Sequence, residues 1–321
     1  MEPRRLGGLS VSEICLGTMT FGKDTARDAA FAQMDRALDA GITFLDTAEM
    51  YPVNPATVGT YGETERVIGE WLARSGTRGR VQIATKVSGP NGGHTRGGRG
   101  YDGAVIRRAV DDSLTRLRTD RIDLYQLHWP KRDVWAFRDN WSFDPRSSSR
   151  ARVIDHMADV LGAMADMVAA GKVREFGLSN ETAWGVMRWL AQAESSGGPR
   201  VVSIQNEYSA LHRLYDTDLA EVGQKEGVTL LAFSPLAAGL LTGKYADGAM
   251  PPGSRAALDR ERGGKGTLGG RRTGRADTAV QVWLRLAQDL GHDPIHMAIA
   301  FVRQRPFPTI PIIGATDVRQ L

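Results

Sequence analysis

The stretch Gly41-Ile42-Thr43-Phe44-Leu45-Asp46-Thr47-Ala48-Glu49-Met50-Tyr51 decides how this chain is organised. Residues 42–45 follow a glycine and are apolar, β-branched or aromatic at most positions, which predicts a buried strand. Asp46 stands where that strand ends, and Tyr51 follows five residues later in a loop. A carboxylate and a phenol are costly to bury without partners, so we expect other polar groups beside them.

Residues 81–85 and 122–127 indicate two further strands, which stop at Lys86 and His128. The carboxyl ends of neighbouring parallel strands lie at one edge, and barrel enzymes assemble their chemistry there. Each polar residue alone is more often structural, as a cap, a loop packing group or a hydrogen-bonded rim residue. Together the four predict an acid/base cluster made of Asp46, Tyr51, Lys86 and His128.

This cluster has the chemistry of a proton donor with activating partners. A free tyrosine has a pKa of about 10 and is a poor acid at neutral pH. Lys86 is expected to stabilise the phenolate and lower the pKa of Tyr51, while Asp46 holds the ammonium in place. His128 can hydrogen-bond a substrate carbonyl and orient it. Such a set can protonate an oxygen as negative charge develops on it, which is what carbonyl reduction requires.

Outside the cluster, the chain alternates between predicted strands and helices. The strands are expected at residues 14–17, 42–45, 81–85, 122–127, 175–178, 201–204, 228–233 and 309–313. The helices are expected at residues 25–40, 63–73, 103–118, 154–170, 182–193, 215–226, 276–290 and 294–303. Eight alternating units favour a closed (β/α)8 barrel over an open doubly wound sheet. We therefore predict an α/β fold, a single (β/α)8 TIM barrel domain over residues 1–321, with an N-terminal β-hairpin at residues 4–11.

The polar stretches fall at predicted strand–helix loops, so no domain boundary is visible. Residues 52–61 are rich in Pro, Asn and Gly, and residues 131–150 are polar with scattered aromatics. Residues 88–101 are rich in Gly, Asn and Arg, a composition that we do not expect in a packed core. Residues 258–275 are most simply a mobile loop; nucleic-acid binding there is the weaker interpretation, because interleaved aromatic side chains are absent.

The composition is that of a soluble globular protein, with 321 residues, 41% hydrophobic and 24% charged. The net charge of +4 does not indicate nucleic acid, and the sequence pI of about 9.3 mildly favours anionic ligands. Cys15 is the only cysteine, which excludes internal disulfides and fits a reducing compartment. Neither a leader segment nor a run of about twenty apolar residues is recognised, so we expect a cytoplasmic protein that does not associate with membranes.

Three other functional classes fit the sequence poorly. No dinucleotide-binding glycine fingerprint follows the first predicted strand. Residues 239–245 resemble a P-loop but are one residue short, and Tyr245 replaces the Ser or Thr that would contact magnesium. Six histidines are present, yet only His128 lies at a predicted strand end and no His-x-His pair occurs. A metal-dependent barrel hydrolase is therefore disfavoured, and no metal site is predicted.

Three motifs resemble those of the aldo-keto reductase superfamily. They are Asp46-Thr47-Ala48-Glu49-Met50-Tyr51-Pro52, Ser113-Leu114-x-Arg116-Leu117-x-x-Asp120-x-Ile122-Asp123-Leu124-Tyr125-x-x-His128, and Gly171-Lys172-Val173-Arg174-x-x-Gly177-Leu178-Ser179-Asn180. The likeness extends over essentially the whole chain. The phrasing of residues 48–52 and 86–90 is most similar to the bacterial Tas-like branch, and potassium-channel β subunits are more distantly similar.

By this resemblance the four clustered residues are catalytic and the cofactor is NADPH, with Asp46 also beside the cofactor. The positions that match nicotinamide contacts are Ser179, Asn180, Gln205 and the stacking residue Phe233. Those that match the pyrophosphate strip and the adenosine 2′-phosphate contacts are Ser234, Leu236, Gly239, Lys244 and Arg255. Those that match contacts from the first and last strands are Gly17, Thr18, Met19, Gly314, Thr316 and Gln320. Independently of the resemblance, Lys244 and Arg255 are basic residues in a Gly/Pro-rich loop and are suited to binding a phosphate.

The resemblance implies an NADPH-dependent oxidoreductase that reduces aldehyde or ketone carbonyls to alcohols, with Tyr51 as the proton donor. An NADP(H)-binding regulatory module with vestigial reductase activity, similar to a channel β subunit, is the alternative. The complete catalytic set favours the enzyme. The expected partner is a small-molecule carbonyl compound, whose identity depends on Met50, Trp129 and loops 52–61, 88–101 and 131–150.

The residues after the last predicted strand leave about one turn for an eighth helix, whereas helices typically need 10–14 residues. We therefore expect a truncated eighth helix and a missing segment of roughly 20–30 residues, by the same reasoning from helix length. The apolar outer face that this helix would cover is then expected to be partly exposed.

Overall fold

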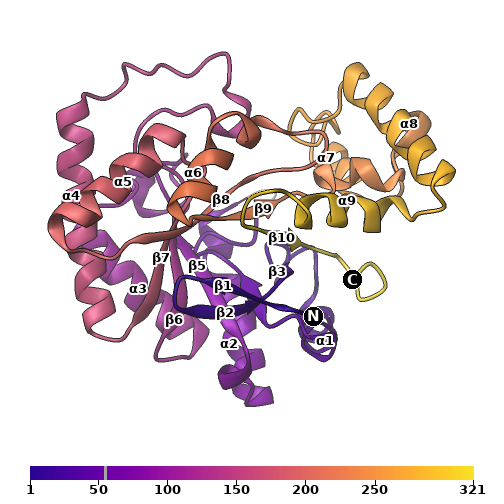
Figure 1. Ribbon diagram of the computed structural model, residues 1–321. Helices are drawn as coiled ribbons and strands as arrows, with labels where there is room; N and C mark the ends of the chain where they lie inside the picture. The colour runs from indigo at the N-terminus through magenta and orange to yellow at the C-terminus, as the bar shows by residue number, and fades with distance from the viewer. Residues whose placement is uncertain (54–55) are drawn as a thin grey trace.

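Eight parallel strands close into a barrel in the computed structural model, which describes residues 1–53 and 56–321 (Figure 1). Residues 54 and 55, part of the predicted 52–61 loop, lie outside the described residues. The barrel strands are β3 (Cys15–Gly17), β4 (Phe44–Asp46), β5 (Gln82–Val87), β6 (Ile122–Leu127), β7 (Val173–Ser179), β8 (Val201–Glu207), β9 (Thr229–Phe233) and β10 (Thr309–Ile313). Each pairs with the next in chain order, and β10 pairs with β3, where Ile312 is opposite Cys15. The predicted (β/α)8 barrel is confirmed.

The predicted N-terminal hairpin is also present, as β1 (Pro3–Leu6) and β2 (Leu9–Ser12). Its apolar residues Leu6, Leu9 and Val11 are buried in one cluster with Phe44 and Leu124 from the barrel strands. Hydrophobic burial fastens the hairpin to the barrel in this way, which leaves the opposite end of the strands for the polar cluster.

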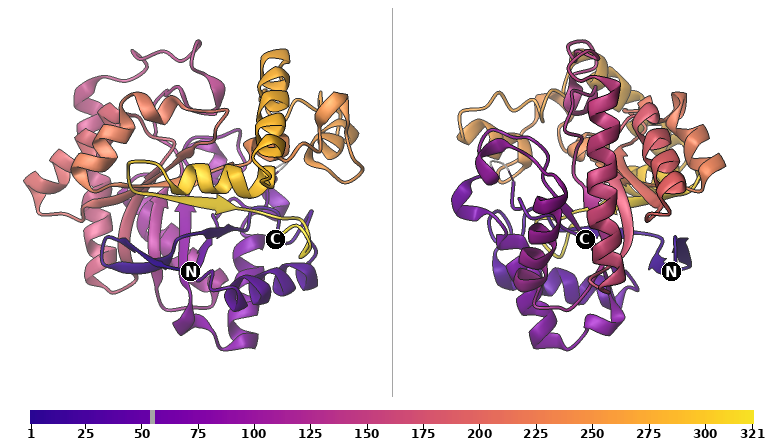
Figure 2. Two further views of the ribbon diagram at one scale, coloured as in Figure 1. Left: turned by 45° about the vertical axis from the view of Figure 1, so that its right-hand side comes forward. Right: turned by 90° about the vertical axis from the view of Figure 1, so that its left-hand side faces the viewer.

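Helices surround the barrel, and α7 and α8 project from one side of it (Figures 1 and 2). They are α1 (Arg27–Asp39), α2 (Glu63–Ser75), α3 (Gly103–Leu117), α4 (Arg150–Ala169), α5 (Ala183–Ser196), α6 (Leu219–Glu226), α7 (Arg255–Glu261), α8 (Gly274–Asp289) and α9 (Pro294–Arg303). No helix in the described part of the chain is long and apolar enough to cross a membrane.

Capping side chains explain where several helices begin. Ser149 accepts a hydrogen bond from the Arg152 N–H, so α4 starts four residues earlier than its apolar pattern predicts. Asp218 accepts one from the Leu219 N–H at 2.6 Å, so α6 starts there and residues 214–217 form a separate 3₁₀ turn. These starts correct the predicted positions at residues 154 and 215.

Two predicted loops contain more structure than their compositions indicate. In the region expected to be a mobile loop, α7 extends to Glu261 and Leu268 is buried. In loop 88–101, Ser88 and Thr95 are buried, although this composition was not expected in packed core. A hydrogen bond to the Glu49 side chain holds Ser88 inside, and hydrogen bonds with the Asn91 side chain hold Thr95.

Close packing of α2 on α3 depends on Gly69. A Cβ at this position would lie 2.3 Å from the Arg116 carbonyl oxygen, which is far inside normal contact distance. The two helices therefore approach over bare backbone, and they close one side of the large core that contains Trp71, Val110 and Tyr125.

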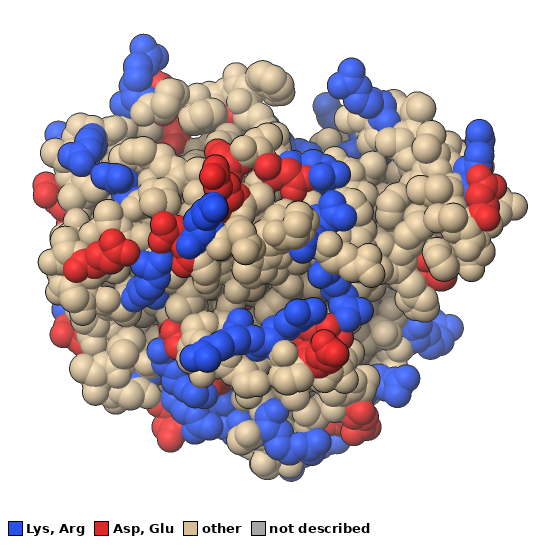
Figure 3. Space-filling view, in the orientation of Figure 1, with Lys and Arg blue, Asp and Glu red and all other residues tan. Residues whose placement is uncertain are grey.

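The chain after β10 forms turns. The Asp317 carboxylate accepts hydrogen bonds from the Arg319 and Gln320 N–H groups. Residues 314–321 contain no helix. Acidic and basic side chains are interspersed over the face seen in Figure 3, and a notch indents its upper edge beside the part that carries α7 and α8.

Candidate active site

Three adjacent strands bring the predicted catalytic residues together. Asp46 is the last residue of β4, Lys86 lies one residue before the end of β5, and His128 directly follows β6. Tyr51 returns to the same place because its N–H bonds to the Ala48 carbonyl oxygen, which closes a turn after β4. All four side chains are at most 9% exposed, so they meet in a largely water-excluded site.

Lys86 is at the centre of the group. Its ammonium donates to the Asp46 carboxylate and to the Thr47 carbonyl oxygen, both at 2.7 Å, and lies 3.5 Å from the Tyr51 hydroxyl. Burial opposes the charge, but Asp46 and Tyr51 together outweigh it, so the pKa of Lys86 lies above its ordinary value. Lys86 is therefore an ammonium at neutral pH.

Asp46 is held by amides as well as by Lys86. Its second carboxylate oxygen accepts hydrogen bonds from Gln205 at 2.8 Å and Gln126 at 3.3 Å. Gln126 was not predicted, although a glutamine within a mostly apolar strand signals a buried polar partner. Gln205 was expected to hold the nicotinamide carboxamide; here its amide nitrogen contacts Asp46, and the expected role remains a prediction.

The expectation that Lys86 brings the pKa of Tyr51 below its ordinary value is wrong in direction. Burial raises the pKa of Tyr51 above its ordinary value of 10.0, and the nearby Lys86 charge only partly offsets this. Burial together with Lys86 lowers the pKa of His128 well below 6.5, so this imidazole is neutral. Its ring contacts the Tyr51 ring edge-on with centroids 5.6 Å apart, and its buried Nδ1 has no hydrogen-bond partner among the described residues. The site thus contains a protonated phenol, an ammonium and a neutral imidazole.

The predicted nicotinamide contacts adjoin this group at the ends of β7, β8 and β9. The Asn180 side chain donates to the His128 carbonyl oxygen at 2.9 Å and to the Ser179 hydroxyl at 3.1 Å. Ser179 in turn donates to the Gln205 carbonyl oxygen at 2.7 Å. Phe233 is the last residue of β9. These bonds fix the edge of the barrel beside His128.

The predicted pyrophosphate strip follows β9 as a series of tight turns. Ser234 and Gly239 both have positive φ, at 56° and 97°. A Cβ on Gly239 would lie 2.7 Å from Cε of Lys244, so glycine allows the lysine stem to pass over the backbone. Leu236 lies between Ser234 and Gly239 and directly precedes the 3₁₀ turn over residues 237–242.

Lys244 and Arg255 have no acidic ion-pair partner within the described residues. The Arg255 guanidinium lies 3.9 Å from the Met19 sulfur, which links the loop after β9 to the loop after β3. Burial, followed by the charge of Arg271, lowers the pKa of Arg255, so an anion beside it would be stabilising. Two unpaired cations flanking Gly-rich turns fit the phosphates of a dinucleotide.

The remaining predicted cofactor residues lie at the junction of β3 and β10. Thr18 donates to the Asp46 carbonyl oxygen at 2.8 Å, and a Cβ on Gly17 would meet Ile312 at 2.8 Å. Gly314 directly follows β10, and the Thr316 hydroxyl lies 3.1 Å from the side-chain oxygen of Gln320. The structure thus places these residues next to one another.

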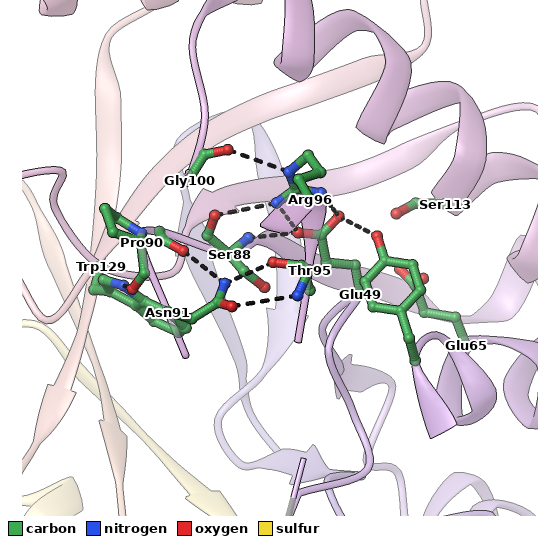
Figure 4. Close-up of polar contacts among 12 residues, drawn as sticks. Glu49, Glu65, Ser88, Pro90, Asn91, Thr95, Arg96, Gly100, Ser113 and Trp129 are labelled. Carbon is green, nitrogen blue, oxygen red and sulfur yellow. Dashed lines mark hydrogen bonds and ion pairs between the residues drawn. The ribbon is translucent and has the colours of Figure 1, made fainter. Parts of the chain in front are cut away.

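A buried polar network beside the cluster was not predicted (Figure 4). The Glu49 carboxylate accepts two hydrogen bonds from Arg96, at 2.6 and 3.0 Å. Glu65, one layer further out, accepts from Thr85 and Arg116, both at 2.6 Å. Within residues 1–53 and 56–321, no group of three or more His, Cys, Asp or Glu side chains could hold a metal ion.

Comparison with known proteins agrees with this geometry. The model of the aldo/keto reductase family matches residues 13–321. Protein tas of Escherichia coli is 44% identical over 319 residues, covering 98% of this chain and 88% of that protein. The uncharacterized oxidoreductase YrpG of Bacillus subtilis is 36% identical over 334 residues, covering all of this chain and 89% of that protein. Norsolorinic acid reductase stcV of Emericella nidulans is 29% identical, covering 98% and 74% of the two chains. With its closed barrel and the converging Asp46, Tyr51, Lys86 and His128, this chain belongs to the aldo/keto reductase family.

Proposed function

We propose that this oxidoreductase reduces aldehyde or ketone carbonyls to alcohols with NADPH, and that Tyr51 donates the proton. The observation that carries the proposal is the buried contact of Lys86 with both Asp46 and Tyr51, at 2.7 and 3.5 Å. When bound, the cofactor supplies the hydride. The protein then needs to bind the carbonyl oxygen and deliver a proton to it.

Each residue of the cluster has a defined part in that proton transfer. The raised pKa of Tyr51 keeps its phenol protonated at neutral pH, so the proton is present but is released only if the phenolate is stabilised. As the proton leaves, the phenolate forms beside the Lys86 ammonium, which stabilises it in a site of low dielectric constant. Asp46 keeps Lys86 in place. Neutral His128 can donate a hydrogen bond from one ring nitrogen to the carbonyl oxygen without competing for the proton.

The residues that we propose for the cofactor are those placed around the mouth of the barrel. Lys244 and Arg255 supply unpaired positive charge for phosphate, and the Ser179–Asn180 pair supplies amide and hydroxyl groups beside His128. The preference for NADPH over NADH rests on those two cations, because a 2′-phosphate adds charge that they can pair with.

The test is NADPH oxidation with a panel of aromatic and aliphatic aldehydes and ketones, followed by absorbance and product analysis. Turnover of at least one carbonyl that is lost in Tyr51→Phe supports the proposal. Tight NADPH binding without turnover of any compound in the panel would overturn it and favour the regulatory alternative. The complete catalytic set, with Lys86 bonded to both Asp46 and Tyr51, argues for turnover.

A further inference from the structure

Glu49 lies between Asp46 and Tyr51 in sequence, yet the proton-transfer chemistry does not use it. Its side chain is fully buried. The carboxylate accepts four hydrogen bonds: Ser88 N–H at 2.6 Å, the Tyr61 hydroxyl at 2.7 Å, and the two Arg96 bonds already described. A buried carboxylate with this many donors is fixed in position and orientation.

These bonds fasten the segment that carries Tyr51 to the strand that carries Lys86. The Glu49 N–H donates to the Lys86 carbonyl oxygen at 3.1 Å, and its side chain accepts from Ser88, two residues further along. Glu49 is thus tied to Lys86 itself and to Ser88, two residues after it. A shift of Glu49 would change the 3.5 Å separation between the Lys86 ammonium and the Tyr51 hydroxyl.

Arg96 ties loop 88–101 to the same carboxylate (Figure 4). Besides Glu49, its guanidinium donates to the Ser88 carbonyl oxygen at 3.1 Å and the Gly100 carbonyl oxygen at 3.2 Å, near the two ends of the loop. Its backbone has a φ of 45°, which is unfavourable for a residue other than glycine. Strain of this kind persists only where surrounding contacts determine the conformation.

Residues near the start of the same loop hold the Trp129 side chain in position. The Trp129 indole N–H donates to the Pro90 carbonyl oxygen at 2.8 Å, and its ring packs on His128 with centroids 4.8 Å apart. A Cβ on Gly89 would lie 2.3 Å from the Trp129 ring, so the loop backbone contacts the indole directly. The Arg96 guanidinium is therefore bonded to the Tyr51 segment and to the loop. The loop backbone in turn contacts Trp129 beside His128.

We propose that Arg96 is a positioning residue. Through Glu49 it sets the Tyr51–Lys86 geometry, and through loop 88–101 it holds Trp129 beside His128. Replacing a buried ion pair by apolar residues of similar volume is often neutral for stability. Stability alone therefore does not explain the Arg96–Glu49 pair. Its bidentate geometry selects one arrangement of the site. The inference rests on the proposed function, because it is the proton donor Tyr51 that Arg96 positions.

An ion pair at the opposite end of β5 provides the control, formed by Arg78 with Asp123, which also pairs with Arg174 at 3.1 Å. Arg78 donates to the buried Asp123 carboxylate at 2.8 Å and to the carbonyl oxygens of Val81 and Arg121. The Arg78 side chain is 17% exposed and that of Arg96 22%, and each holds a loop to a buried carboxylate. Arg78 adjoins the beginning of β5, away from Tyr51.

The experiment compares Arg96→Met with Arg78→Met. Both are expected to lower Tm. Only Arg96→Met should lower kcat, by roughly 10- to 100-fold for a misplacement of about 1 Å, with the NADPH Kd little changed. Only Arg96→Met should also shift the Trp129 indole resonance in a ¹⁵N spectrum, assigned with Trp129→Phe. Arg96→Lys keeps the charge but loses the bidentate hydrogen-bonding geometry of the guanidinium. Its kcat should therefore lie between those of Arg96→Met and the unmodified enzyme.

Equal effects of the two substitutions on kcat, with an unmoved Trp129 resonance, would overturn the inference. If either Met variant does not fold, Glu49→Gln and Asp123→Asn replace the pair, with the same readouts and the same contrast expected. Absence of carbonyl turnover in the unmodified enzyme would defeat the proposed function instead. The Trp129 resonance would then still decide whether Arg96 holds the loop.

Discussion

The Lys86 ammonium lies 2.7 Å from the Asp46 carboxylate inside a site that excludes most water. An unpaired ammonium at this depth would lose its proton or draw in solvent, because burying a lone charge is costly. The pair instead keeps the charge in place, and Gln205 and Gln126 occupy the other Asp46 oxygen. Lys86 is thereby held where negative charge on the Tyr51 oxygen would develop.

Removing the Tyr51 hydroxyl tests the proton donor directly. Tyr51→Phe keeps the ring that contacts His128 but has no ionisable proton. Carbonyl reduction should fall by about 10²–10⁴-fold, the usual range for a lost general acid. The NADPH Kd, measured by fluorescence titration, should stay near the unmodified value. Turnover within a few-fold of the unmodified enzyme would remove Tyr51 from the role.

The pKa directions predict the pH dependence of reduction. Reduction needs the protonated phenol, which is present below the Tyr51 pKa, and burial places that pKa above 10.0. It also needs neutral His128, which is present above a pKa well below 6.5. The rate of reduction should therefore show no loss between pH 7 and 9, whereas alcohol oxidation, which needs the phenolate, should rise with pH. A difference titration between unmodified enzyme and Tyr51→Phe should show no tyrosinate signal below pH 10; a signal near pH 8 would contradict the stated direction.

Cofactor choice is predicted to depend on Arg255. A charge-assisted hydrogen bond is worth about 1.5–3 kcal/mol, so Arg255→Ala should raise the NADPH Kd roughly 10- to 100-fold. NADH lacks the 2′-phosphate and should lose much less. Arg260→Ala, on the same helix but exposed, should change neither constant. An equal loss for both cofactors would mean that Arg255 does not contact the 2′-phosphate.

Two glycines should respond to alanine with opposite signs. Gly162 in α4 is exposed, and nothing lies within 4 Å of an added Cβ, so Gly162→Ala should stabilise the protein by about 0.5–1 kcal/mol through helix propensity. Gly69→Ala should destabilise it by about 1–3 kcal/mol, because the methyl group overlaps the Arg116 carbonyl and forces α2 away from α3. Urea unfolding monitored by circular dichroism measures both. A gain in stability for Gly69→Ala would show that the α2–α3 contact yields easily.

The sequence predicts the barrel well because its strands carry strong local signals. The bounds of β6 and β10 agree residue for residue with the predicted strands, because mostly apolar segments of this length are typical of strands buried on both faces. Helix starts were less accurate where a cap such as Ser149 lies several residues before the first core position. The short helix α7 was missed because glycines and charges around it hide its pattern.

The sequence predicted the site residues that lie at strand ends, but not the residues that hold them in position. Asp46, Lys86 and His128 could be brought together because strand adjacency fixes where strand ends lie. Nothing local in a Gly-rich loop shows that Arg96 reaches Glu49, 47 residues away. The sign of the Tyr51 pKa shift failed for a related reason: sequence shows which charge is near, but not how fully the phenol is buried.

The pairing of β10 with β3 also has a consequence for how the chain is made. Cys15 is translated long before its partner Ile312. Until that moment the nascent sheet has two open edges, at β3 and β9, that can pair with other chains. The helices and strands between them can form as they emerge, but the ring cannot close until β10 has been made. Any pause in translation before residue 309 therefore prolongs the interval in which the unfinished molecule is exposed to aggregation.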